Sequence, residues 1–357
     1  MKKFLALLLA LTMALALVAC GGGSDTADTG SGDTSTGDTA TGEFESMTWK
    51  FACSATETSP WVDGAKEFAR IVGEQTGGAI TVQYYPADQL TAGSQTDGIQ
   101  ALMDGTTELS MHSNLIWSSF DQRFNVVSLP FLFDSVEEAD AALDGAGGQA
   151  LGEILESEYN VHLLGIAENG FRHITNSKHA VTSLADMENL KIRVAGSQLL
   201  NRAYELWGAD YTNANWSEVF TALQTGTYDG QENPLPTADA ASIQEVQSYL
   251  TYWTGAYDCL FFCMNADLYN SLSPELQAIV DEAGQAACEY ERELNRGQDQ
   301  EIMDKWAEAG VEVTELSADA AAEFAEASAP VYDEFADELT PELIEAFTSV
   351  TQADNAA

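Results

Sequence analysis

The chain has 357 residues, in which 57 Asp and Glu outnumber 14 Lys and Arg and give a formal net charge of −43. This length suits about two compact lobes, and an apolar content of 45% is enough for hydrophobic cores. A surface this acidic repels nucleic-acid phosphates, which argues against a nucleic-acid-binding protein. It also disfavours small anions unless basic side chains gather at one place.

The first 20 residues are typical of an export signal. Lys2 and Lys3 precede an apolar run, residues 4–18, that is too short to span a bilayer. The run ends in Leu-Val-Ala-Cys20 followed by three glycines, which resembles a bacterial lipobox. We therefore expect a signal peptide over residues 1–20, a lipid on Cys20, and a protein anchored at the cell surface or in the periplasm. The alternative is an ordinary signal peptide that contains a cysteine.

Residues 21–46 are expected to form a flexible stalk. Up to residue 42 this segment contains only Gly, Ser, Thr, Ala and Asp. It therefore has too little apolar surface to offset the entropy of ordering. The stalk would hold the folded part away from the membrane.

From residue 47 the pattern alternates between strand and helix. Alternating or continuous apolar runs predict strands over residues 47–54, 80–85, 108–111, 161–167 and 191–194. Apolar spacing and capping residues predict helices over residues 61–76, 94–103, 197–207, 215–226 and 274–305. Ser135 with Glu138, and Ser183 with Asp186, have the spacing of N-terminal caps. This alternation predicts an α/β fold with sheets covered by helices.

A short internal repeat has two interpretations. Residues 101–106 and 222–227 share the pattern A-L-x-x-G-T, each at the end of a predicted helix. The pattern indicates either common helix-stop chemistry or two lobes built alike.

The cysteines and histidines do not predict a metal site. Cys53, Cys259, Cys263 and Cys288 match no zinc spacing, and the four histidines are scattered. Strand residues four apart, such as Cys259 and Cys263, are about 13 Å apart at roughly 3.3 Å per residue, too far for a disulfide. We expect these cysteines to pack in the core, and we expect no metal or cofactor.

The basic residues are unevenly distributed. Five of them, Arg172, Lys178, Lys191, Arg193 and Arg202, fall within 31 residues. They either pair with the abundant carboxylates or form an anion pocket in which Arg presents its planar fork to a carboxylate. Arg193 lies on a predicted strand and Arg172 follows one, and ligands of α/β proteins usually bind at strand ends.

Three segments carry a family resemblance. They are Gly-Phe-Arg172-His-Ile-Thr-Asn176, the segment from Leu184 to Val194 that contains Lys-Ile-Arg193-Val, and the segment from Glu218 to Pro234 that contains Asp-Gly-Gln-Glu-Asn233-Pro. They resemble the solute-binding proteins of tripartite ATP-independent (TRAP) transporters, of the dicarboxylate-binding (DctP) type. The similarity extends from about residue 47 to the C-terminus.

The resemblance implies a two-lobe clamshell like that of periplasmic binding proteins. Each lobe would be a mixed sheet flanked by helices, and hinge strands and a long helix would join them. The implied boundaries are residues 47–170 plus 259–298 for lobe I and residues 171–258 plus 299–357 for lobe II. The protein would capture a small organic acid between the lobes and deliver it to the small and large TRAP membrane subunits.

The resemblance also implies a set of binding residues. Arg193 would make the main bidentate contact with the substrate carboxylate, Arg172 a second contact, and Asn233 would support the same carboxylate. Trp216 stands where the family has a pocket aromatic. Asn189 replaces a glycine that usually precedes the K-I-R strand, and Asn tolerates the left-handed conformation. Lobe I is poorly matched, so Gln95, Asn114 and Trp117 are only candidates there.

Two other functions are weighed against this one. A lipid-anchored hydrolase could use two of the many carboxylates, but the sequence has no G-x-S-x-G or H-E-x-x-H motif and no recognisable Cys/His pair. A sugar-binding protein of an ATP-driven importer is the binding alternative, favoured by twelve Tyr and seven Trp. We expect a binding protein and not an enzyme.

Overall fold

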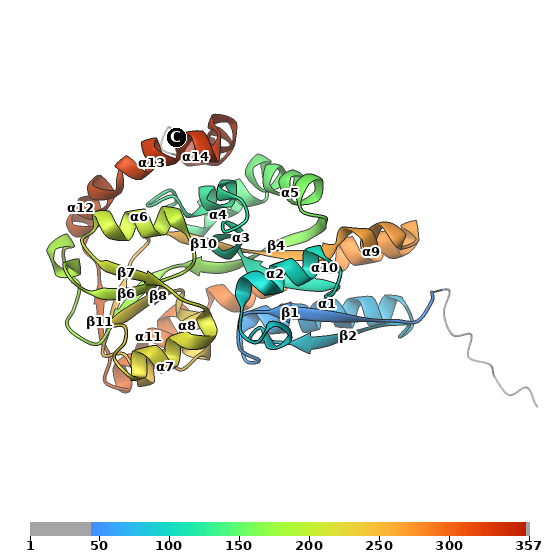
Figure 1. Ribbon diagram of the computed structural model, residues 1–357, viewed down its shortest axis with the longest axis horizontal. Helices are drawn as coiled ribbons and strands as arrows, with labels where there is room; N and C mark the ends of the chain where they lie inside the picture. The colour runs from blue at the N-terminus through green and yellow to red at the C-terminus, as the bar shows by residue number, and fades with distance from the viewer. Residues whose placement is uncertain (1–43, 355–357) are drawn as a thin grey trace, which may run out of the picture. The chain divides into compact units, whose positions relative to one another are not determined.

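The computed structural model describes residues 44–354, and the expected signal peptide, Cys20 and nearly all of the stalk lie outside them. The described chain forms two mixed β-sheets (Figure 1). The first has the order β2-β1-β3-β10-β4, with β1 Met47–Cys53, β2 Ile80–Tyr85, β3 Leu109–Ser113, β4 Val161–Phe171 and β10 Tyr257–Asn265. The second has the order β11-β9-β5-β8-β6-β7, with β5 His173–Asn176, β6 Lys191–Val194, β7 Asp210–Asn213, β8 Gly230–Asn233, β9 Tyr249–Tyr252 and β11 Glu312–Glu315.

Helices flank both sheets, as the alternating sequence pattern predicted. In chain order the α-helices are α1 Pro60–Gln75, α2 Gln95–Met103, α3 Asn114–Trp117, α4 Val136–Leu143, α5 Ala146–Glu158, α6 Gln198–Leu206, α7 Trp216–Gln224, α8 Leu235–Ala240, α9 Ala266–Ser271, α10 Pro274–Arg296, α11 Asp299–Glu308, α12 Ala318–Ser328, α13 Pro330–Leu339 and α14 Pro341–Asp354. The short 3₁₀ helices are η1 Gln89–Thr91, η2 Gln122–Ser128, η3 Leu184–Met187 and η4 Ile243–Glu245. None of the described helices is both long and apolar enough to cross a lipid bilayer.

The chain passes from one sheet to the other at three places. Arg172 alone separates β4 from β5, residues 253–256 separate β9 from β10, and residues 297–298 separate α10 from α11. The backbone N–H of Arg172 donates to the carbonyl of Ala256 at 2.9 Å, which ties the two strand crossings together. The sequence predicted one helical stretch up to Lys305. The structure divides it at Gly297, where the chain leaves the layer of α1 and β4 for that of α8 and β11.

Buried aromatic residues fill the space between the first sheet and helices α1 and α10. Phe262 of β10 packs edge-on against Phe51 and Phe68, with ring centroids 5.8 and 5.1 Å apart. Burying one such side chain stabilises the fold by about 2 kcal/mol. Cys53, Cys259, Cys263 and Cys288 are all buried and free, which confirms the expectation that they pack in the core.

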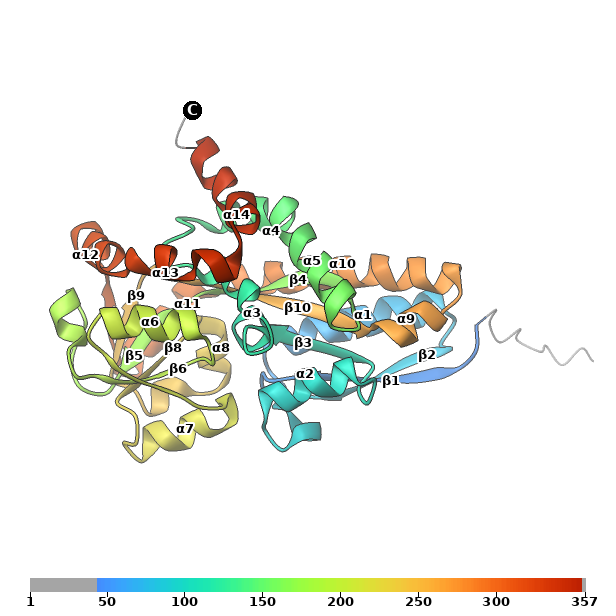
Figure 2. The same ribbon diagram turned by 45° about the horizontal axis from the view of Figure 1, so that its top comes forward.

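The C-terminal helices contact elements next to both sheets (Figure 2). Helices α12 and α13 pack against α6, whereas α14 packs against α4 and α5. Phe347 of α14 is fully buried, and its ring lies 6.5 Å from that of Phe133. This packing fixes the C-terminal segment on the outside of the fold.

Candidate functional site

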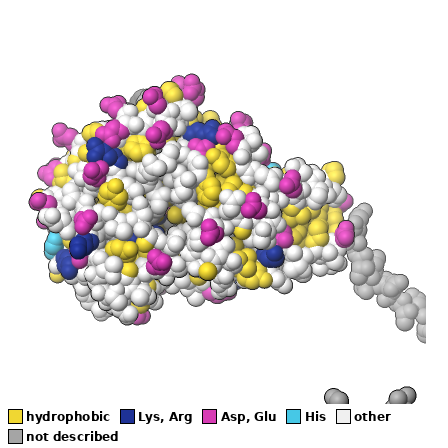
Figure 3. Space-filling view, viewed as in Figure 1, with side chains coloured by type: hydrophobic (Ala, Val, Ile, Leu, Met, Phe, Trp, Pro, Cys, Tyr) yellow, Lys and Arg dark blue, Asp and Glu magenta, His cyan; other side chains and the backbone are white. Residues whose placement is uncertain are grey.

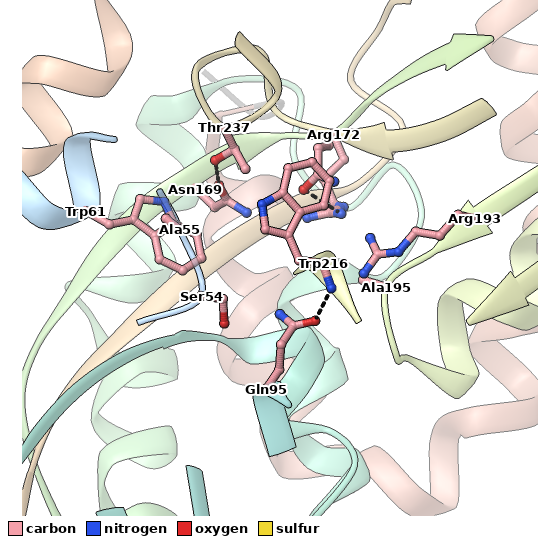
Figure 4. A pocket seen from close by; sticks show the side chains of 11 residues that line it. Ser54, Ala55, Trp61, Gln95, Asn169, Arg172, Arg193, Ala195, Trp216 and Thr237 are labelled. Carbon is pink, nitrogen blue, oxygen red and sulfur yellow. Dashed lines mark hydrogen bonds between the residues drawn. The ribbon is translucent and has the colours of Figure 1, made fainter. Parts of the chain in front are cut away.

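A small cavity lies where elements of the two sheets face each other (Figure 4). Its volume is about 30 Å³, roughly enough for one or two water molecules. The residues that line it come from strand ends and adjacent helix starts, namely Ser54, Ala55, Trp61, Gln95, Asn169, Arg172, Arg193, Ala195, Trp216, Asn233 and Thr237. Strand ends are the usual ligand position in α/β folds.

Arg193 is a buried cation with no carboxylate partner in the described part of the chain. Strand β6 points its side chain inward, and only 2% of the residue is exposed. Its Nε and Nη2 donate to the carbonyl of Ala214 at 3.0 and 2.6 Å. Among residues 44–354, no carboxylate oxygen lies within 4.0 Å of this guanidinium and Nη1 has no acceptor. Burial lowers the pKa of Arg193 to about 10, so the group is still charged at neutral pH.

The indole of Trp216 lies against the same guanidinium, 5.7 Å from its centre to the ring centroid. A cation beside an aromatic face is stabilised by the ring quadrupole, by roughly 0.5–2 kcal/mol. This contact offsets only part of the cost of burying a charge. An anion bound at Nη1 would offset the rest of this free-energy cost.

Arg172 shares the cavity but is already paired with carboxylates. Glu232 accepts from its Nε and Nη2, and Asp258 accepts from its Nη1. The Nη2 group also donates to Asn233 Oδ1 at 3.0 Å. Burial opposes the charge of Arg172, but the two carboxylates outweigh it and hold its pKa above the usual range. Only one of the two Nη1 protons is left for another acceptor.

The two sides of the cavity are joined by hydrogen bonds between residues 93–95 and residues 215–217. The backbone N–H of Trp216 donates to Gln95 Oε1 at 3.1 Å, a bond drawn in Figure 4. Ser217 Oγ donates to the carbonyl of Gly93 at 3.0 Å. The predicted cap residue Asn215 does sit at the start of α7, but its side chain makes no capping bond. It accepts instead from the backbone N–H of Gln95, at 3.5 Å.

Sequence comparison places this chain in a family. A model described as "Bacterial extracellular solute-binding protein, family 7" (DctP) matches residues 51–339. The chain belongs to this family. The TRAP solute-binding resemblance seen in the sequence is thereby confirmed, as is its expectation of a substrate-binding component of transport.

Relatives and solved structures of the DctP family agree with this assignment. The 2,3-diketo-L-gulonate-binding periplasmic protein YiaO of Escherichia coli K12 is 32% identical over 74% of this chain and 80% of its own length. The sugar acid binding protein DctPAm of Advenella mimigardefordensis, solved with galactonate, has a TM-score of 0.83 at 28% identity and covers 87% of this chain and 99% of that one. A TRAP periplasmic protein of Sulfurospirillum deleyianum, solved with succinate, has a TM-score of 0.79 at 28% identity and covers 86% and 100%. The predicted two-lobe fold is confirmed by these structures.

Five of the seven residues that the sequence suggested for binding line the cavity, namely Arg172, Arg193, Asn233, Trp216 and Gln95. The structure places the other two elsewhere. Asn114 is fully buried, donates to Phe124 O and Ser128 Oγ, and accepts from Cys259 N. Trp117 packs in an aromatic cluster. Both side chains are used by the core.

Sequence reasoning missed several residues that line the cavity. Ser54 directly follows β1, so the strand-end rule could have found it. Trp61 lies in the first turn of α1, and nothing in its local pattern distinguishes it from a core residue. Asn169 and Thr237 are joined by a 2.6 Å hydrogen bond that positions both at the cavity wall. No group of three or more metal-ligating side chains occurs in the part of the chain that the structure describes.

Proposed function

We propose that this protein captures a small organic acid, as its carboxylate, in the cleft between the lobes, which would open beyond the cavity of about 30 Å³ that it encloses in this structure. The buried guanidinium of Arg193, which has no carboxylate partner among residues 44–354, carries the proposal. A buried cation without a counter-ion costs free energy, and a carboxylate that binds its free Nη1 in a fork geometry offsets that cost. The acids bound by other DctP members support the same ligand class.

The other lining residues have supporting roles in this proposal. The remaining Nη1 proton of Arg172 reaches a second carboxylate oxygen, and Asn233 holds the Arg172 fork in place. Trp216 covers the bound group. Gln95 links the lobes once they close. Closure excludes water, and charge-assisted bonds are stronger in the drier site.

We also propose how the protein works at the membrane. The lipobox-like sequence supports attachment through Cys20, with the stalk as a tether. The family supports delivery of the ligand, chemically unchanged, to the small and large TRAP membrane subunits. The two parts that would close follow the boundaries inferred from the sequence, residues 47–170 plus 259–298 and residues 171–258 plus 299–357, except that α14 packs on α4 and α5 and would move with the first part.

A panel of organic acids tests the binding proposal by thermal stabilisation and calorimetry. One-site binding at about 100 times Kd adds roughly 2.7 kcal/mol to the stability of the protein. Arg193→Gln is expected to weaken binding of the tightest-binding acid by about 100-fold, because it removes a buried charge-assisted contact. Lys191→Gln, an exposed position on the same strand, is the matched control and should bind normally. Unchanged affinity in Arg193→Gln would refute the proposal.

A further inference from the structure

Two buried polar side chains at the cavity lack hydrogen-bond partners among the residues that the structure describes. Ser54 and Trp61 are each 4% exposed, and both line the cavity. Neither Ser54 Oγ nor Trp61 Nε1 has a partner among residues 44–354. Leaving such a group unpaired costs about 1–3 kcal/mol. Both of these energetically costly groups lie at the proposed ligand site.

The position of these two groups sets them apart from other unpaired atoms. Trp49 and Trp117 also have a buried, unpartnered Nε1, but neither residue lines the cavity. Figure 4 shows Trp61 and Ser54 toward one side of the site and Arg193 toward the other. A ligand whose carboxylate binds Arg193 would therefore extend toward Ser54 and Trp61.

The charges around the cavity determine which chemical group of the ligand can lie beside Ser54 and Trp61. Arg193 is the one lining cation that lacks a carboxylate partner among the described residues, because Arg172 is paired with both Glu232 and Asp258. No Lys, His or further Arg lines the cavity near Ser54 and Trp61. A second carboxylate placed there would be buried beside neutral groups, which is unfavourable.

A hydroxyl group fits the two unpaired atoms best. Trp61 Nε1 can only donate, so it needs an acceptor, whereas Ser54 Oγ can donate or accept. A hydroxyl oxygen can accept from Trp61 Nε1, and a hydroxyl proton can be donated to Ser54 Oγ, so hydroxyl groups match the hydrogen-bonding capacity of both atoms. A methyl group would leave both atoms unpaired.

We infer that Ser54 and Trp61 form a neutral hydroxyl subsite and that the protein selects hydroxy monocarboxylates over dicarboxylates. This inference rests on the proposed binding of a carboxylate by Arg193. It adds the second contact point, at the opposite end of the ligand, and predicts which class of acid is rejected.

Two matched pairs of acids test the selectivity by calorimetry. 4-Hydroxybutyrate and succinate differ only in one terminal group, a hydroxymethyl against a carboxylate, and galactonate and galactarate differ in the same way. We expect the hydroxy member to bind at least tenfold more tightly in the pair that fits the site. If the dicarboxylate binds as tightly while Arg193→Gln still weakens binding by about 100-fold, the inference fails and the carboxylate function stands. If none of the panel acids binds, both fail.

Two substitutions test the subsite itself. Trp61→Phe keeps an aromatic ring but removes the N–H, and Ser54→Ala removes the hydroxyl. Each substitution should weaken binding of the hydroxy acid about three- to tenfold. Each should leave the matching acid that ends in a methyl group, such as butyrate, unchanged. Trp49→Phe is the control, since it removes an equally buried N–H that does not line the cavity. An equal loss for both acids in Trp61→Phe would show a packing role and overturn the subsite.

Discussion

Arg172 and Arg193 line the same cavity but have different roles, because their neighbouring charges differ. Arg172 is paired with Glu232 and Asp258 inside the protein, so its charge stabilises the crossing between the sheets. Among the described residues, Arg193 has no carboxylate within 4.0 Å and contacts the carbonyl of Ala214 and the indole of Trp216, so its charge is available to an anion. The sequence alone placed both in the same basic cluster. The partners, which come from β8 and β10, decide which one is free.

Removing the Arg172 charge is predicted to destabilise the protein in a pH-dependent way. Arg172→Gln leaves two buried carboxylates without a cation, which costs about 3 kcal/mol at pH 7. Burial already raises the pKa of Asp258, and loss of the cation raises it further. The folded variant therefore binds a proton more readily than the unfolded chain. The loss of unfolding free energy, relative to the unsubstituted protein, should shrink as the pH falls from 7 to 5.

Urea unfolding of Arg172→Gln and of the unsubstituted protein at both pH values measures this deficit. Arg70→Gln is the control, because Arg70 pairs with Glu67 and Glu74 on an exposed helix face and should matter little at either pH. A deficit that grows toward pH 5 would contradict the burial argument.

At the scale of elements, local signals predicted most of the fold. The strands at residues 80–85 and 191–194 were predicted to the residue. Asn189 adopts the left-handed conformation expected of it, with φ of 64°. The repeated A-L-x-x-G-T segments end α2 and α7 in the same way, with φ of 71° at Gly105 and 73° at Gly226. Each of these features depends on neighbours in sequence.

The features that the sequence did not predict depend on distant contacts. Asn114 and Trp117 follow a strand, as binding residues often do, but η2 and β10 bury both. Trp61 reaches the cavity only because α1 packs beside β1 while α7 and β6 approach from the other sheet. The capping spacing at Asn215 correctly predicted a helix start. Its side chain, however, accepts a hydrogen bond from the backbone N–H of Gln95 and does not cap the helix. Such contacts require the folded arrangement of both lobes.

The contact between α7 and the loop before α2 predicts an effect on affinity. Ser217 Oγ donates to Gly93 O across the cleft, a bond that exists only when the lobes touch. Ser217→Ala should therefore weaken acid binding about three- to tenfold, with little change in the unfolding free energy of the ligand-free protein. Ser157→Ala on the exposed face of α5 removes a comparable bond and should bind normally. Calorimetry and urea unfolding separate the two effects, and a loss of stability without a loss of affinity would rule out a role in closure.

At the scale of the whole molecule, the net charge opposes the proposed ligand. Acidic side chains are spread over the visible surface, with few Lys and Arg between them (Figure 3). A formal charge of −43 therefore repels an organic acid from a distance, while buried Arg193 attracts it only at short range. The two contributions differ in how salt screens them. Surface charges are screened over a Debye length, whereas a contact inside the closed cavity is screened much less.

Binding of the best monocarboxylate is consequently predicted to tighten as salt increases. Between 10 and 150 mM salt the Debye length falls from about 30 Å to about 8 Å, which removes most of the long-range repulsion. We expect affinity to rise by roughly tenfold over this range, measured by calorimetry. Sodium fluoride and sodium chloride at equal ionic strength control for chloride competing at Arg193, and both should give the same trend. If affinity falls with salt in both, the local attraction of the basic cluster outweighs the field of the acidic surface.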